Sequence, residues 1–291
     1  MTKNILEVKK LKKYYGDIRG VESVSLYLKE GEAYGFIGPN GAGKSTTIKT
    51  IMNLINKTSG SITINGKEND KNNLELKRII GYLPSEINLY SDLTVREMLD
   101  FHESFYDKCL TKRRNELVNL FKLDETKRIE DLSFGNLKKL GIILALIHEP
   151  KILILDEPTS GLDPIMQKEF YNILLEEKKK GTTILYSTHV LSEVSKICDR
   201  VGIIKDGHLL KVETIKELKN KNLNNVTILS KDVDKISKDL KNIDFVINNN
   251  KLEFKNTMDS NKLIKLLSKY DIEDLLIEEA TLEEMFLHYY N

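Results

Sequence analysis

GPNGAGKST, residues 38–46, has glycines, a lysine and a serine in the spacing Gly-x-x-x-x-Gly-Lys-Ser. An apolar run of strand length precedes it at residues 30–38, and a helical pattern follows over 43–54. A glycine-rich turn between a strand and a helix lets backbone N–H groups and the helix dipole face an anion. Lys44 can neutralise phosphate charge, and Ser45 can hold a divalent cation. The segment therefore predicts an α/β domain that binds phosphate.

A second apolar strand ends in two acidic residues. KILILDEPTSGLDP, residues 151–164, places Asp156 and Glu157 directly after the apolar run. Ligands bind at the carboxyl ends of the strands in such a sheet, so we expect both carboxylates to lie at the phosphate site. Asp156 is placed to hold Mg²⁺ through water, and Glu157 to orient or deprotonate a water that attacks phosphorus. A solvated acidic turn is the alternative.

Composition narrows the class of protein. The 291 residues carry 45 Lys+Arg and 44 Asp+Glu, a net charge of +1, which gives no reason to expect a nucleic acid partner. Cys109 and Cys198 form no Cys-x-x-Cys pair, which fits a reducing cytosol. The longest apolar runs, residues 140–147 and 152–155, are far shorter than the ~18 residues that a membrane span needs. We therefore expect another polypeptide to supply any spans.

Strands alternate with helices along residues 1–218, which predicts a largely parallel core sheet. The capping box of Thr94 and Glu97 predicts the start of a helical stretch over 94–123. Further helices are expected over residues 43–54 and 164–180, and strands over residues 5–11, 21–28, 30–38, 79–86, 152–156, 182–187 and 200–211.

The composition changes at KNKNLNN, residues 219–225, a polar run suited to a linker. Residues 226–291 follow a β-α-β-β-α-β order, which indicates a small α+β domain of ferredoxin-like arrangement. A last helix is expected over ATLEEMFLHYY, residues 280–290, with Thr281 and Glu284 as a capping box. The other elements are strands at 226–230, 244–248, 251–255 and 272–278 and helices at 233–242 and 261–270.

Four motifs follow one another along the chain: GPNGAGKST at 38–46, LSFGN at 132–136, ILILDEPTSGLDP at 152–164 and YSTHV at 186–190. In this order and spacing they resemble the ATP-binding cassettes of ABC transporters over roughly residues 1–218. The resemblance implies a P-loop cassette with a mostly parallel core sheet, an antiparallel β subdomain and a helical subdomain at about 90–145, followed by the small α+β domain. It also implies ATP and Mg²⁺ as cofactors and an ATPase reaction coupled to transmembrane transport.

The same resemblance assigns roles to individual residues. Tyr15 matches the aromatic residue that stacks on adenine, with Tyr14 as the alternative. Glu157 matches the catalytic glutamate, and His189 matches the switch histidine that contacts the γ-phosphate. The ATP-binding loop comprises Gly38, Pro39, Asn40, Gly41, Ala42, Gly43, Lys44, Ser45 and Thr46.

In that family two cassettes close head to tail, so each chain supplies half of an ATP site. The signature residues that face the other chain's nucleotide are Ser133, Phe134, Gly135 and Asn136, and the loop at the dimer interface contributes Ser160 and Asp163. Ser133 and Asp163 also fit the simpler role of helix caps. Phe134 replaces a signature glycine and Asn136 a glutamine, but Ser133 and Gly135 remain.

The expected Mg²⁺ ligands are Ser45 and Asp156. A glutamine that normally reaches the metal and the attacking water is replaced here by Ser85 in GYLPSEINLY, residues 81–90. Glu86, or a water held by Ser85, is one candidate to fill this place. The alternative is that Glu86 faces solvent and hydrolysis is slow.

One set of motifs, with no sustained heptads between Lys44 and Asp156, favours a transporter motor. An ABC-type ATPase that acts on nucleic acid or the ribosome is the alternative. SFGN, YLPSE and the ending at 280–290 resemble ATP-binding subunits of bacterial drug, antibiotic and bacteriocin exporters of the type-2 class, although that ending has the alternative role of packing on its own small domain. We therefore expect a cytoplasmic motor, peripheral on the inner face of the cell membrane. It would form a homodimer on ATP binding and join a separate integral-membrane permease, with no nucleic acid partner.

Overall fold

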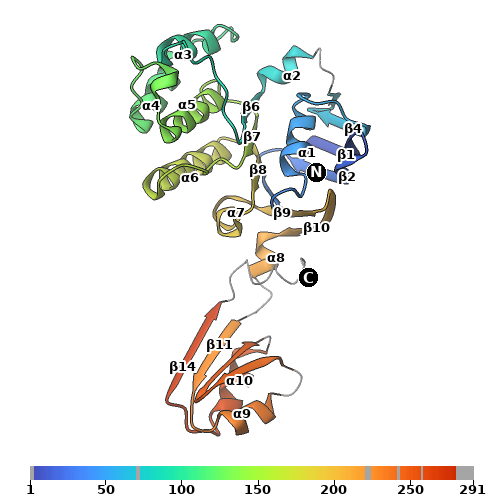
Figure 1. Ribbon diagram of the computed structural model, residues 1–291, viewed down its shortest axis with the longest axis vertical. Helices are drawn as coiled ribbons and strands as arrows, with labels where there is room; N and C mark the ends of the chain where they lie inside the picture. The colour runs from blue at the N-terminus through green and yellow to red at the C-terminus, as the bar shows by residue number, and fades with distance from the viewer. Residues whose placement is uncertain (1–2, 70–72, 220–223, 241–242, 257, 280–291) are drawn as a thin grey trace. The chain divides into compact units, whose positions relative to one another are not determined.

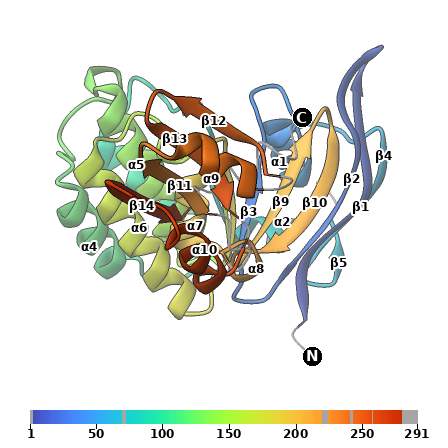
Figure 2. The same ribbon diagram turned by 90° about the horizontal axis from the view of Figure 1, so that it is seen from below.

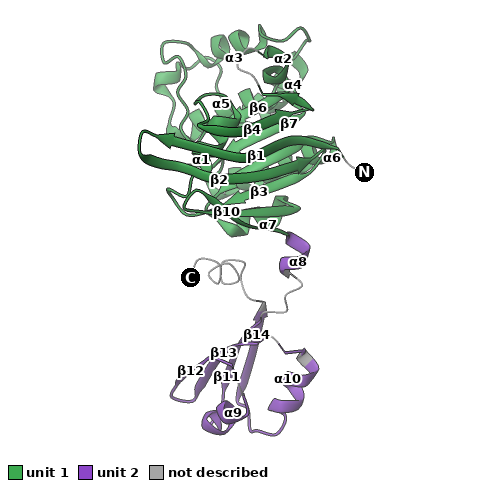
Figure 3. Cartoon of the chain, turned by 90° about the vertical axis from the view of Figure 1, so that its right-hand side faces the viewer, with its two compact units in different colours: residues 1–213 green, residues 214–291 purple. Residues whose placement is uncertain are grey.

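The computed structural model describes residues 3–69, 73–219, 224–240, 243–256 and 258–279. The chain divides into two compact units, residues 1–213 and 214–291 (Figure 3). Each unit has a hydrophobic core of its own. The division falls earlier in the chain than the linker expected at 219–225, of which residues 220–223 lie outside the described part.

Ten strands among the described residues form one sheet, in the order β5-β4-β1-β2-β10-β9-β3-β8-β7-β6 (Figure 1). Neighbours in this order are often distant in sequence, as α/β crossovers require. The strands are β1 Asn4–Tyr15, β2 Ile18–Lys29, β3 Ala33–Ile37, β4 Ser59–Ile64, β5 Lys67–Glu68, β6 Ile80–Leu83, β7 Ile152–Asp156, β8 Thr183–Thr188, β9 Arg200–Lys205 and β10 His208–Thr214.

The core of this sheet is parallel, as predicted. β3 pairs in parallel with β8 and β9, and β7 pairs in parallel with β6 and β8. Every residue of β3, β7 and β8 is buried, which is typical of a parallel sheet covered on both faces. The register aligns Asp156 with Ser187 and Ile37 with Thr188. The segments that follow these three strands therefore start side by side at one edge of the sheet.

The other end of the sheet is the expected antiparallel β subdomain. β1 pairs antiparallel with β2 and β4, and β4 pairs with β5. Figure 2 shows the long, curved strands β1 and β2 beside β9 and β10. Alternate residues of β1 and β2 are buried in the core, including Leu6, Val8, Leu26 and Leu28.

The helices before the second sheet are α1 Lys44–Ile51, α2 Leu74–Arg78, α3 Val95–Glu103, α4 Thr111–Phe121, α5 Phe134–Leu146, α6 Pro164–Lys179, α7 Leu191–Ile197 and α8 Ile215–Lys219, with a 3₁₀ turn at Ile129–Asp131. α3, α4 and α5 lie together beside β6 and β7 (Figure 1), as the expected helical subdomain. Three predicted helix starts are confirmed: Thr94 forms its capping box, and Ser133 and Asp163 each accept a backbone N–H of the first turn.

The single helical stretch expected over residues 94–123 is wrong, because residues 104–110 separate α3 from α4. Residues of this segment pack against parts of the chain that are distant in sequence. The ring of Tyr106 stacks on that of His148, with centroids 4.6 Å apart, and Leu110 is 3% exposed. These packing interactions override a local helical pattern.

The second unit contains a four-stranded antiparallel sheet in the order β12-β13-β11-β14. Both helices pack on one face of it, because the side chains of Val226, Ile228, Leu252 and Phe254 share a core with those of Ile236 and Leu263. The predicted β-α-β-β-α-β succession is confirmed. The expected last helix and its Thr281–Glu284 capping box lie outside the described residues. The elements are β11 Asn224–Leu229, α9 Val233–Asp239, β12 Phe245–Asn248, β13 Lys251–Asn256, α10 Ser260–Leu267 and β14 Asp274–Glu279.

Because each unit has its own core, a chain that ends at Lys221 should fold without the second unit. We expect a single cooperative thermal transition by circular dichroism, and ATP binding nearly equal to that of the full chain by calorimetry. A fragment that folds but does not bind ATP would show that the second unit contributes to the site.

Candidate functional site

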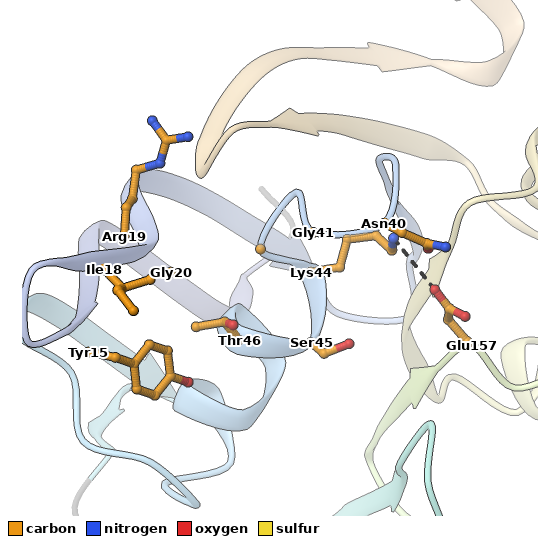
Figure 4. A pocket seen from close by; sticks show the side chains of 11 residues that line it. Tyr15, Ile18, Arg19, Gly20, Asn40, Gly41, Lys44, Ser45, Thr46 and Glu157 are labelled. Atoms are coloured by element: carbon orange, nitrogen blue, oxygen red, sulfur yellow. Dashed lines mark ion pairs between the residues drawn. The ribbon is translucent and has the colours of Figure 1, made fainter.

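An open pocket of about 300 Å³ lies where three separate parts of the first unit meet (Figure 4). These parts are the adjoining ends of β1 and β2, the loop before α1 with the first turn of that helix, and the residue that follows β7. The predicted residues that line it are Tyr15, Asn40, Gly41, Gly43, Lys44, Ser45, Thr46 and Glu157. Gly38, Pro39 and Ala42 belong to the same loop but are not among the lining residues. The structure thus brings the expected adenine and phosphate residues to one pocket.

Lys44 supplies a buried cation at the start of α1, with 4% of the residue exposed. Its ammonium donates hydrogen bonds to the carbonyl oxygens of Gly38 at 2.8 Å and Pro39 at 3.2 Å. Burial lowers the pKa of Lys44, and the attraction of the Glu157 carboxylate opposes this shift. Gly43 has a φ of 104°, which a residue with a Cβ rarely adopts. The glycine turn therefore presents a helix N-terminus and one cation to the pocket.

Tyr15 forms the opposite end of the pocket (Figure 4). Tyr15 is 46% exposed, and the ammonium of Lys13 lies 4.5 Å from the centroid of its ring. A Cβ on Gly20 would lie 3.0 Å from this ring, so glycine permits the ring to pack closely on the start of β2. The hydroxyl of Tyr14 instead donates to Glu22, and Tyr14 is not a lining residue. The exposed Tyr15 ring offers a flat surface on which a base can stack.

Ile18, Arg19 and Gly20 also line the pocket, and no sequence motif predicts them. They are the first residues of β2, and Ile18 pairs with Tyr15 at the end of β1. Their place directly after the predicted stacking residue was the one available signal. Arg19 brings a second positive charge, which forms a 3.4 Å ion pair with Asp206.

Asp156 and Glu157 lie beside the glycine loop, as the strand pattern predicts. Asp156 is fully buried, and its Oδ1 accepts a hydrogen bond from the Ser187 hydroxyl at 2.9 Å. Glu157 Oε1 lies 3.5 Å from Lys44 Nζ and 3.4 Å from His189 Nδ1. Glu157 has a φ of 48°, a strained conformation for a residue with a side chain and one that is common at functional sites. One carboxylate therefore lies between the predicted phosphate-binding lysine and the predicted switch histidine.

The residues around Asp156 suit a hydrated divalent cation. Asp156 Oδ2 and the Tyr82 hydroxyl are buried without a hydrogen-bond partner among the described residues, which marks a place for water or an ion. No described group of three or more His, Cys, Asp or Glu could hold a metal alone. Mg²⁺ commonly binds through one or two carboxylates, waters and substrate phosphates. Ser85 is half-buried and Glu86 exposed, and neither lines the pocket.

Glu193 of α7 organises the loops behind the site and was also missed. It is 6% exposed and accepts hydrogen bonds from Thr159 at 2.6 Å, Tyr186 at 3.0 Å and Thr188 at 2.8 Å. The Thr188 hydroxyl in turn accepts the N–H of Val190 at 3.0 Å. This network joins the segments that follow β7 and β8, and so limits the movement of the loop that carries the predicted switch histidine.

The signature residues lie at the start of α5, away from this chain's own pocket. Ser133 caps the helix by accepting the N–H of Asn136 at 3.4 Å. Phe134 is 60% exposed, and its ring lies against Gly161, where an added Cβ would be only 2.0 Å away. Gly135 lies close to the same residue, because a Cβ added to it would be 3.3 Å from the Gly161 carbonyl oxygen. The signature and the loop of residues 157–163 are therefore packed together.

Ser160 and Asp163 occupy this loop, and both are exposed. Asp163 Oδ1 accepts the N–H of Met166 at 2.9 Å, so this residue does cap α6. An exposed loop, an exposed aromatic ring and a helix N-terminus together form a surface outside the nucleotide pocket.

The fold and the pocket define a P-loop protein that binds and hydrolyses a nucleoside triphosphate. A family model described as ABC transporter matches residues 21–160. The chain is 38% identical over 219 residues to the linearmycin resistance ATP-binding protein LnrL of Bacillus subtilis, covering 74% of this chain and 70% of the relative. It is 39% identical to the bacitracin transport ATP-binding protein BcrA of Bacillus licheniformis, over 75% of this chain and 72% of the relative. The chain belongs to the ATP-binding proteins of ABC transporters.

The likeness also extends beyond the first unit. The ABC transporter ATP-binding protein YcbN of Bacillus subtilis is 32% identical over 299 residues, covering 99% of this chain and 97% of the relative. A solved ATP-binding subunit of an ABC transporter superposes with a TM-score of 0.70 at 33% identity, covering 74% of this chain and 92% of that chain. The dimeric structure of the ATP-binding cassette MJ0796, bound to ADP and Pi, superposes with a TM-score of 0.65 at 26% identity. The match covers 72% of this chain and 98% of that chain.

The chain is thus an ATPase subunit whose reaction is coupled to transport, and the alternative role on nucleic acid or the ribosome is not supported. Of the residues that the structure describes, none belongs to a helix that is both long and apolar enough to span a membrane.

Replacing Tyr15 with alanine should raise the Kd for ATP by roughly 5- to 150-fold, because base–aromatic stacking is worth about 1–3 kcal/mol. Tyr14→Phe is the matched control, since it removes only the hydroxyl that contacts Glu22. Calorimetric titration with ATP measures both variants. Equal affinities for Tyr15→Ala and the unaltered chain would exclude the ring from base recognition.

Proposed function

We propose that this chain is the motor of a membrane exporter and hydrolyses MgATP between two copies closed head to tail. The observation that carries the proposal is the Glu157 carboxylate, 3.5 Å from Lys44 Nζ and 3.4 Å from His189 Nδ1 at the edge of the pocket. A carboxylate between a phosphate-binding cation and a histidine is placed to accept a proton from a water that attacks phosphorus.

The chain's own residues divide the work of hydrolysis. Lys44 and the N-terminus of α1 stabilise phosphate charge, and the burial of the lysine strengthens this attraction. Glu157 orients the water and takes its proton, and His189 contacts the terminal phosphate. Ser45 and Asp156 would hold Mg²⁺, which would neutralise charge on the phosphate oxygens.

The second half of the site would come from another copy. Ser133 and the backbone N–H of Gly135 stand at the N-terminus of α5, where a helix favours an anion. They do not line their own chain's pocket, so their proposed anion is the terminal phosphate held by the partner. The dimeric cassette MJ0796 supports such an assembly. Ser160 and Asp163 would lie along the interface between the copies.

Export and membrane attachment are the remaining parts of the proposal. The names of LnrL and BcrA concern linearmycin resistance and bacitracin transport, which supports an exporter of antibiotic-type compounds. A separate integral-membrane permease would form the path for the cargo. The chain would then be held in the cytoplasm, against the inner face of the membrane.

Glu157→Gln should lower the ATPase kcat by roughly 100-fold or more, because a general base typically contributes 10²–10⁴. The amide keeps the size of the side chain, so ATP should still bind and should now trap a dimer, detectable by light scattering. Glu176→Gln, an exposed residue of α6, is the matched control and should change neither property. Normal phosphate release from Glu157→Gln would remove this residue from the reaction.

Gly135→Asp should abolish hydrolysis while the monomer still binds ATP, because a carboxylate at the interface repels the partner's phosphate. Gly135→Ala is the control that distinguishes the effect of the negative charge from that of an added side chain. Its Cβ would lie 3.3 Å from the same Gly161 carbonyl oxygen but carries no charge. We expect the alanine variant to keep much more activity than the aspartate variant in a phosphate-release assay. Equal loss in both would contradict an electrostatic role at a shared site.

A further inference from the structure

A second buried lysine, Lys138, is attracted by the carboxylates of the acidic pair and does not line the nucleotide pocket. It belongs to the second turn of α5 and is 1% exposed. Its ammonium lies 3.4 Å from the carbonyl oxygen of Pro84 and 3.5 Å from that of Ser85. Burial lowers the pKa of Lys138 to about 8, against the attraction of Asp156 and Glu157, which raises it.

Asp156 and Glu157 therefore interact electrostatically with two buried lysines, which come from different helices. Lys44 comes from α1 and lines the pocket, where a phosphate can pair with it. Lys138 comes from α5 and is not among the lining residues, so a nucleotide does not explain its charge. The attraction of Asp156 and Glu157 acts on both lysines.

Stability does not explain Lys138 either. Its two acceptors lie at the outer limit of hydrogen-bond length, so they repay little of the cost of removing an ammonium from water. A methionine has nearly the same length and needs no partner. A buried charge that costs stability and is attracted by the two carboxylates of the proposed reaction site is typical of a functional group.

The position of Lys138 suggests what it holds. Pro84 and Ser85 begin the loop that runs from the core strand β6 to α3, and α5 begins with the signature residues. The ammonium contacts the first of these segments, belongs to the second and is attracted by the carboxylates at the end of β7. Lys138 thus links the loop that leads into the helical subdomain and one helix of that subdomain to the electrostatic attraction of the acidic pair.

We propose that Lys138 is a positioning residue for ATP hydrolysis, which ties the start of the loop after β6 and the signature helix to the acidic pair. The proposal rests on the role proposed above for Asp156 and Glu157. With the ammonium in place, the loop stays against the site, and movement of the loop and movement of the signature helix are linked.

The test compares Lys138→Met with Lys139→Met, the same change at a half-buried neighbour on the same helix. In Lys138→Met we expect kcat to fall about tenfold or more, because the change removes a buried positive charge that attracts both Asp156 and Glu157. The KM for ATP should change little, because Lys138 does not line the pocket. The melting temperature should stay the same or rise, since a desolvated charge is removed.

Hydrogen exchange reports the loop directly and without nucleotide. Amides of residues 85–90 should exchange faster in Lys138→Met and at the normal rate in Lys139→Met. Normal kcat and normal exchange in Lys138→Met would overturn the proposal, as would a loss of kcat that accompanies a lower melting temperature with unchanged exchange. Failure of the proposed catalytic role itself is distinguishable, because it would show as normal turnover in Glu157→Gln.

Discussion

Parallel backbone pairing in the core is the constraint on which the site depends. Asp156 is aligned with Ser187, and Ile37, which ends β3, is aligned with Thr188. Three chain segments far apart in sequence are thereby forced to begin at the same sheet edge, before any side chain of the site makes contact. The charges gather at this edge because the carboxylates and the glycine-loop lysine lie at or soon after the aligned strand ends. The apolar strands supply the stability that these charges cost.

Most of the fold was predictable because residues close together in the sequence determine where its strands and helices begin. The glycine loop, the apolar strand before Asp156 and the caps at Thr94, Ser133 and Asp163 are local signals, and each appears where expected. The break at 104–110 was not predictable, because it depends on packing between residues far apart in sequence. The short helices α2, α7 and α8 carry too few residues for a clear period.

The site divides in the same way. Residues within a motif were found, whereas Arg19, Glu193 and Lys138 belong to no motif and acquire their roles from neighbours in space. An arginine at the start of a strand, a glutamate on a short helix and a lysine after a helix cap are ordinary in sequence. Only burial and distance distinguish them. The same holds for the choice between Tyr14 and Tyr15, since alternation along one strand places just one of them on the lining of the pocket.

Phe134 shows how an apparent departure from a motif can be accommodated. Its ring occupies the space above Gly161, whose φ of 80° and lack of a side chain both allow the contact. A glycine at position 134 would leave that space empty, whereas the aromatic ring joins the start of α5 to the loop that carries Ser160 and Asp163. Since 60% of Phe134 remains exposed, the ring also contributes apolar area to the outer surface. The ring therefore links the start of α5 to this loop, so movement of either segment alone would break the contact between Phe134 and Gly161.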